Sequence, residues 1–158
     1  VDRLSTELEN YSHNCHSGNK MLDVILNRYV LECEKRSLQF EYDVKVCNLK
    51  EIEDIDLVTI LGNLLDNAIE ASEKSEEKTV YLETSTRNAY KVIVLQNSSL
   101  PPQESSGHLQ TSKSDRSMHG FGLKSVAKCL KKYHGDLYWV YDQDSHLFTM
   151  TVMIDTIL

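Results

Sequence analysis

The stretch Asp56-Leu-Val-Thr-Ile-Leu-Gly-Asn-Leu-Leu-Asp-Asn-Ala-Ile-Glu-Ala-Ser72 decides the fold of this chain. Its apolar side chains recur at intervals of three and four residues, the spacing that places them on one side of an α-helix. The pattern predicts an amphipathic helix over about residues 56–72, packed against a core by one broad face. That face consists of Leu57, Ile60, Leu61, Leu64, Leu65, Ala68 and Ile69.

The same helix carries a polar stripe opposite its apolar face. Asn63, Asn67 and Glu70 follow at intervals of four and three residues, so their side chains line one side. Asparagine is a poor helix former because its amide competes for backbone hydrogen bonds. One interpretation is a solvated face. The other is a pair of amide oxygens at the floor of a pocket, since Mg²⁺ prefers oxygen ligands and often takes few from the protein beside substrate phosphates.

Hydrophobic patterns on both sides of this helix predict two more helices and several strands. The helices are expected at about residues 19–36 and 123–133, the second ending at Gly135 as a left-handed cap. Strands are expected at 38–44, 79–86, 91–96, 137–141 and 147–154.

A long polar segment and a glycine-containing turn lie between the predicted strands and the last helix. Residues 98–118 are rich in serine and hold both prolines of the chain, which indicates either a functional lid or a tolerated surface insertion. The turn His119-Gly-Phe-Gly-Leu-Lys-Ser-Val126 follows. Its glycines let the backbone approach a ligand, and the free amides of the helix start favour a phosphate. A plain turn is the alternative. The P-loop pattern GxxxxGK[ST] and the GxGxxG pattern are both absent from the sequence, which argues against those two nucleotide-binding classes.

Composition narrows the classes of protein further. The chain has 158 residues, a length typical of one domain, and a formal net charge of −7, which argues against general nucleic-acid binding. No apolar run is long enough to span a membrane, and no signal peptide is recognisable. The four cysteines are scattered without metal-ligand spacing, which favours a reducing compartment. They are Cys15, Cys33, Cys47 and Cys129.

The order of these elements and the motif Asn63–Ser72 resemble the catalytic domain of sensor histidine kinases, in the gyrase/Hsp90/histidine-kinase/MutL superfamily. The likeness covers about residues 19–154 and is greatest for the receptors that sense peptide pheromones in quorum sensing. It implies a two-layer α/β sandwich of the Bergerat type, with a mixed, largely antiparallel sheet and helices packed on one face. It also implies ATP and Mg²⁺ as cofactors.

The resemblance assigns roles to individual residues. Asn67 corresponds to the magnesium-binding asparagine, and Asn63 lines the same site one turn earlier, so these two are the expected catalytic residues. The second glycine box corresponds to Gly120 and Gly122, with Leu123 beside them, and the phosphate-binding lysine of the lid corresponds to Lys113.

One departure from the family pattern and one difference from the ATPases of the superfamily affect the expected chemistry, and Glu70 stands where many family kinases have a basic residue. The first glycine box is missing and Gln96-Asn97-Ser98-Ser99 stands in its place, so Asn97 is the candidate adenine anchor. The ATPases of the superfamily carry a glutamate as general base where this chain has Asn63. Because an amide cannot accept a proton near neutral pH, this favours phosphoryl transfer over hydrolysis.

The expected protein is therefore a kinase domain that acts on a histidine outside it. Residues 1–18 are expected to be the tail of an upstream dimerisation helix, with His13 and His16 as linker residues, and residues 19–158 the ATP-binding domain with a lid at 98–118. We expect a fragment of a membrane-anchored homodimer working in the bacterial cytosol, with its own dimerisation domain and a response regulator as partners. The alternatives are a serine kinase or ATPase of the same superfamily, and a degenerate interaction module without ATP.

Overall fold

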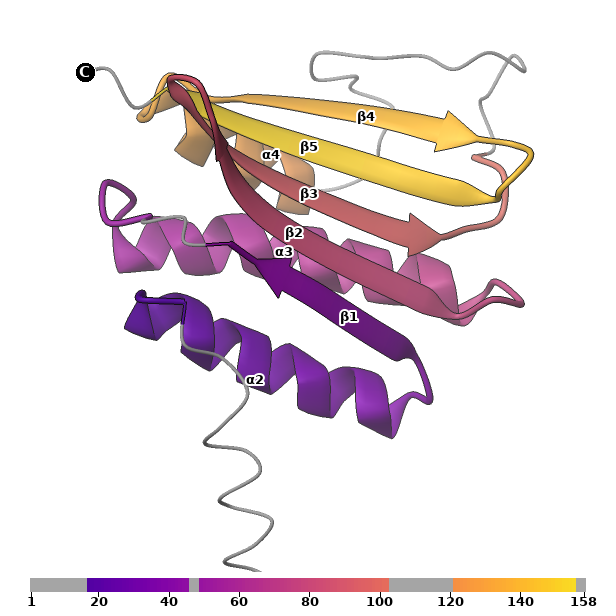
Figure 1. Ribbon diagram of the computed structural model, residues 1–158. Coiled ribbons are helices and arrows are strands. Elements are labelled where there is room, and N and C mark those ends of the chain that lie inside the picture. The colour runs from indigo at the N-terminus through magenta and orange to yellow at the C-terminus, as the bar shows by residue number, and fades with distance from the viewer. Residues whose placement is uncertain (1–16, 46–48, 103–120, 156–158) are drawn as a thin grey trace, which may run out of the picture.

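The computed structural model describes residues 17–45, 49–102 and 121–155, which form two layers (Figure 1). One layer is a sheet of five strands, and the helices of the described residues all cover one face of it. The helices are α2 (Lys20–Lys35), α3 (Asp54–Glu73) and α4 (Phe121–Lys131). The strands are β1 (Gln39–Val44), β2 (Thr79–Arg87), β3 (Tyr90–Ser98), β4 (Asp136–Asp142) and β5 (Leu147–Asp155).

The sheet has the order β1-β2-β3-β5-β4. Edge strand β1 pairs with β2 in parallel, and the other three pairings are antiparallel. This confirms the expected mixed, largely antiparallel sheet with helices on one face.

The core lies between the helices and the inner face of the sheet. All seven apolar residues expected on the α3 face are 0–2% exposed. They pack on alternate residues of the strands, because successive side chains of a strand point to opposite faces. These inward residues include Val80, Leu82, Ile93, Leu95, Met150 and Val152.

Element ends differ from the sequence-based expectations by a few residues. Helix α3 begins two residues early, at Asp54, and strand β3 continues through Ser98, which is fully buried. Ser98 therefore belongs to the sheet, although it was expected to open the lid. Its hydroxyl lies 2.7 Å from the Ser75 hydroxyl and accepts from the Thr79 amide at 2.9 Å, so it ties β3 to the segment that follows α3.

The expectation that Gly135 ends the last helix in a left-handed conformation is wrong. Helix α4 ends at Lys131, and the positive φ of 49° belongs to His134. Gly135 is needed for space: a Cβ there would lie 3.1 Å from both Leu130 Cδ2 and the Met153 carbonyl oxygen. The glycine thus allows the start of β4 to pack closely against the end of α4.

The contacts at both ends of α3 fix its direction relative to its neighbours. Glu51, just before α3, forms an ion pair with Lys91 at the start of β3. Ser75, just after α3, bonds to Ser98 at the end of β3, so α3 and β3 run in the same direction. None of the helices in the described ranges is long and apolar enough to cross a membrane.

Candidate functional site

The first glycine of α4 lies directly against the polar stripe of α3. A Cβ built on Gly122 would lie 2.8 Å from Asn63 Oδ1, closer than a side chain tolerates. The amide nitrogen of Asn63 donates to the Thr59 carbonyl at 2.7 Å, which leaves the amide oxygen on the side of α4. The two residues that the resemblance assigned to one site are therefore brought together. Gly122 lies inside the helix, whereas the sequence had placed it in the turn before it.

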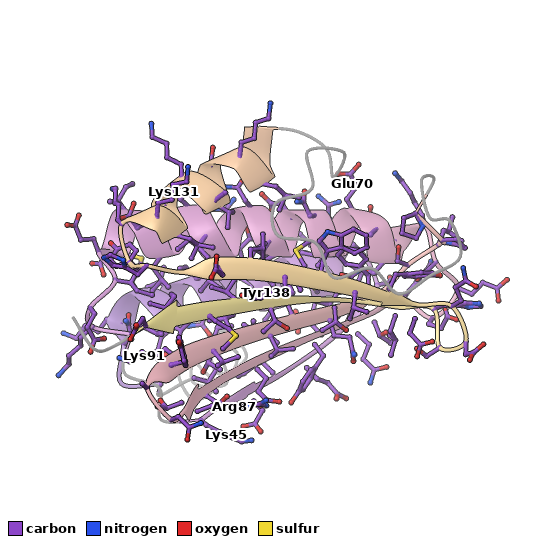
Figure 2. All side chains as sticks on the ribbon, turned by 90° about the horizontal axis from the view of Figure 1, so that it is seen from above. Lys45, Glu70, Arg87, Lys91, Lys131 and Tyr138 are labelled. Atoms are coloured by element: carbon purple, nitrogen blue, oxygen red, sulfur yellow. The ribbon has the colours of Figure 1, made fainter. Side chains whose placement is uncertain are left out.

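The other end of α4 shows that it runs antiparallel to α3. Cys129 in the last turn of α4 and Lys132 just after the helix contact Asp56 in the first turn of α3. Gly122, in contrast, lies against Asn63 in the middle of α3. In Figure 2, Lys131 and Glu70 lie toward opposite ends of the helical layer. The N-terminus of α4 consequently points along α3 toward Asn67 and Glu70.

This geometry gives Asn67 different surroundings from those of Asn63. Asn67 is one turn further along the stripe, half-buried, and beyond the point where α4 begins. Within the described ranges, no hydrogen bond is formed by its side chain. A polar amide thus lies near the positive end of the α4 dipole, an arrangement suited to an anionic ligand and its counter-cation.

Asn97 lies on the inner face of the sheet at the same end of the domain. It is 2% exposed and sits between the apolar residues Val80 of β2 and Phe148 of β5. Its amide nitrogen donates to the Ser98 carbonyl at 3.0 Å, and its oxygen accepts no bond from the described residues. A buried amide whose oxygen bonds to none of the described residues is suited to recognising a polar ligand.

Some expected site residues do not point toward the contact between α4 and the polar stripe of α3. Others lie outside the described ranges. Leu123 is half-buried and packs against the core, so it supports the start of α4. Lys113 and Gly120 lie outside the described residues, as does most of the expected lid. Glu70 is exposed and pairs with Lys74 at 3.6 Å, an interaction of a kind that contributes little in water.

Sequence interpretation missed a cluster around a buried aspartate that holds α4 on α3. Asp56 is 3% exposed and accepts bonds from Tyr133 at 2.6 Å, Lys132 at 3.2 Å and Cys129 at 3.3 Å. The Tyr133 hydroxyl bond, followed by those of Lys132 and Cys129, lowers the pKa of Asp56 below its ordinary value. The carboxylate in turn raises the pKa of Lys132. The sequence shows only that Cys129, Lys132 and Tyr133 are spaced three and four residues apart, which does not identify Asp56 as their partner.

The Tyr133 hydroxyl also completes the start of α3. Glu53, the residue before that helix, makes no side-chain cap, and its backbone amide donates to the Tyr133 hydroxyl at 3.0 Å. The segment after α4 therefore satisfies a donor that the N-terminus of a helix leaves unpaired. The Asp56 cluster, defined here as Asp56, Cys129, Lys132 and Tyr133, fixes one end of α4 while Gly122 contacts Asn63 near the other.

Within the described residues, no three His, Cys, Asp or Glu side chains gather into a metal-binding group. The described cysteines, Cys33 and Cys129, are free thiols, and burial raises the pKa of Cys33 to about 11.

Comparison with known proteins agrees with this architecture. The family model described as GHKL domain matches residues 52–155. The catalytic domain of histidine kinase ThkA, in a nucleotide-free form, superimposes with a TM-score of 0.64 at 15% identity, over 87% of this chain and 92% of that one. No curated protein sequence matches.

Two further kinases share the fold. The mycobacterial sensor histidine kinase MprB gives a TM-score of 0.59 at 19% identity, over 85% of this chain and 93% of that one. The Acinetobacter baumannii histidine kinase AdeS gives 0.61 at 13% identity, over 87% of this chain and 64% of that one. At such identities the likeness shows a common fold.

Proposed function

The chain belongs to the GHKL domain family, and from this premise we propose that it is the ATP-binding catalytic domain of a sensor histidine kinase. It would bind Mg-ATP and transfer the γ-phosphate to a histidine on a separate dimerisation domain. We place it among the receptors for peptide pheromones, on the motif Asn63–Ser72 and on the loss of the first glycine box. Its downstream partner would be a response regulator.

The observation that carries this proposal is the approach of Gly122 to Asn63. A Cβ at Gly122 would meet Asn63 Oδ1 at 2.8 Å, so only glycine brings the first turn of α4 this close to the polar stripe. The approach aims the free amides of the α4 start past Asn63 toward Asn67. A helix start aimed at an amide that bonds to none of the described residues is suited to a polyphosphate and a divalent cation.

The residues present fit Mg-ATP in three places. Asn67 would supply an oxygen ligand to the cation, the α4 start would hold the phosphates, and Asn97 would hydrogen-bond the adenine. Bound Mg²⁺ supplies charge neutralisation on the transferring phosphoryl group, and positioning provides most of the remaining catalysis. Lys113 and Gly120 would complete the phosphate contacts.

The identity of residue 63 favours a kinase over an ATPase. The Asn63 amide donates to the Thr59 carbonyl, so it is held in place and offers no proton acceptor for an attacking water. Asn63→Glu would place a carboxylate at this point, and we expect faster ATP hydrolysis. An unchanged hydrolysis rate in a folded, ATP-binding variant would count against the assignment of Asn63.

A second candidate is an interaction module that no longer binds nucleotide. It is favoured by the regular end of β3, where Asn97 and Ser98 still pair with β5 in place of a glycine-rich loop. Titration with a non-hydrolysable ATP analogue separates the two candidates, since the module would not bind the analogue even at millimolar concentration.

The same titration tests the site residue by residue. Asn67→Ala should abolish magnesium-dependent binding, measured calorimetrically with and without Mg²⁺. Asn27→Ala is the matched control, because it makes the same change at a half-buried helical asparagine on α2. Equal affinities of the two variants would show that Asn67 is not the cation ligand. Phosphorylation of a separately supplied dimerisation domain, with labelled ATP, would then test the transfer itself.

A further inference from the structure

The tryptophan side chain holds a buried hydrogen-bond donor that pairs with none of the described residues. Trp139 is the only tryptophan of the chain. Its Nε1 is inaccessible to solvent and has no hydrogen-bond partner in the part of the chain that the structure describes. Buried donors are almost always paired, and leaving one unpaired carries a real energetic penalty. A bound molecule that accepts from this nitrogen would remove the penalty.

The surroundings of Trp139 place it beside the proposed nucleotide site. Its ring stacks on Phe148, with centroids 5.5 Å apart and planes inclined by 19°. Phe148 is in turn the direct cross-strand partner of Asn97. Asn97 and Phe148 are both buried, and the stacked Trp139 ring lies with them among the side chains that pack on the core. The stack therefore lies on the same face of the sheet as Asn97 and beside it.

Strand directions place Trp139 at the same end of the domain as the start of α4. Strands β3 and β4 both pair antiparallel with β5, so β4 runs in the direction of β3 and hence of α3. Helix α4 runs the opposite way. Because Gly135, just before β4, packs against Leu130 at the end of α4, the later residues of β4 lie toward the N-terminus of α4. Trp139 is one of these later residues.

We propose that Trp139 and Phe148 form an aromatic wall of the nucleotide site and that Trp139 Nε1 donates a hydrogen bond to the nucleoside part of the ligand. This inference rests on the proposed function and adds a specificity determinant to it. Aromatic rings offer a nucleobase an apolar, polarisable surface, and an indole N–H is complementary to the ring nitrogens and ribose oxygens that a nucleoside presents. The triphosphate, by contrast, would be held at the start of α4.

Because the chain has one tryptophan, the ligand itself can report the contact. A non-hydrolysable ATP analogue with Mg²⁺ should change the tryptophan emission of the wild-type chain in a saturable way, and adenosine at high concentration should do the same. Tripolyphosphate with Mg²⁺ should leave the emission unchanged, because it lacks the nucleoside.

A conservative variant separates the hydrogen bond from the packing. Trp139→Phe keeps an aromatic ring against Phe148 and removes the donor, so affinity for the analogue should fall about three- to tenfold, the worth of one net hydrogen bond. Without nucleotide, loss of the N–H should not lower the midpoint of thermal unfolding of Trp139→Phe, because this donor pairs with none of the described residues. Tyr138→Phe is the matched control: it lies next along β4, its side chain points to the opposite face (Figure 2), and affinity should be unchanged.

The outcomes distinguish this inference from the function it rests on. If calorimetry shows that the wild-type chain binds the analogue while the emission stays constant and Trp139→Phe binds equally well, the aromatic wall is refuted and the proposed function stands. If the wild-type chain binds no analogue, both are refuted. An emission change produced equally by tripolyphosphate would also refute the wall, since the tryptophan would then respond to phosphate binding elsewhere.

Discussion

Gly122→Ala tests the close approach between α4 and α3. Gly122 does not have a positive φ, so alanine fits the backbone and should stabilise the chain by about 0.7 kcal/mol through the unfolded state. The added Cβ, however, would lie 2.8 Å from Asn63 Oδ1. The Asn63 amide must then turn away and lose its bond to Thr59.

The opposing contributions predict the sign of the change. Loss of the 2.7 Å bond between Asn63 Nδ2 and the Thr59 carbonyl costs about 1 kcal/mol, and an unfavourable rotamer about 1 kcal/mol more. The net effect of Gly122→Ala is therefore a loss of about 1 kcal/mol in the free energy of unfolding. In an Asn63→Ala background the clash is absent, and the same substitution should stabilise the chain by about 0.7 kcal/mol.

Urea denaturation of four proteins measures this coupling directly: wild type, the two single variants and the double variant. The expected coupling free energy is about 2 kcal/mol, well above the roughly 0.5 kcal/mol within which independent sites add. Equal effects of Gly122→Ala in both backgrounds would refute the contact. Analogue affinity, measured on the same proteins, should fall in the single variant Gly122→Ala because the start of α4 is displaced.

The remaining predictions concern stability. Asp56→Asn should lower the free energy of unfolding by about 2 kcal/mol, because it weakens the hydrogen bonds to a buried carboxylate. Asp54→Asn changes an exposed residue in the same helical turn and should lower the free energy of unfolding by only about 0.5 kcal/mol. Urea denaturation measures both changes. Since folding lowers the pKa of Asp56, its contribution is complete at neutral pH and is lost as pH falls through that lowered pKa; an acid-unfolding midpoint identical in Asp56→Asn and wild type would contradict this. Gly62→Ala should stabilise α3 by up to about 1 kcal/mol, since the atom nearest to the new Cβ is 3.6 Å away. Gly135→Ala should destabilise the chain, since the new Cβ would lie 3.1 Å from the backbone oxygen of Met153. Thermal unfolding of each variant measures both changes.

Local patterns predicted the elements and the core well. The apolar positions of α3 repeat regularly and are all buried, because a helix face of this width can be satisfied only by packing. The strand ends were less predictable, since Ser98 is a polar residue in the sheet only because Ser75 and Thr79 bond to its hydroxyl. Gly135 was expected to end the helix in a left-handed conformation, whereas in the structure its missing side chain allows close packing against Leu130 and Met153.

The candidate site was only partly predictable, because part of it depends on which residues of α3 and α4 pack against each other. Asn63 and Gly122 were placed together by resemblance, and the structure brings the two residues next to each other. The Asp56 cluster could not be derived, since a helix pattern gives the face of a residue and not the residue opposite. The unused donor of Trp139 depends on what surrounds one atom, which no sequence pattern records.

Helix α4 is held on α3 by hydrogen bonds near its C-terminal end, so a tilt about that end displaces its N-terminal end. The Asp56 cluster clamps it near Cys129, and Gly122 lies about 10 Å farther along the axis at a rise of about 1.5 Å per residue. A tilt of about 3° at the Asp56 cluster would therefore move Gly122 by roughly 0.5 Å, about a fifth of the 2.8 Å between a Cβ built on Gly122 and Asn63 Oδ1. A small tilt at the Asp56 cluster is thus enlarged at Gly122, so the close approach of Gly122 to Asn63 depends on contacts two turns away.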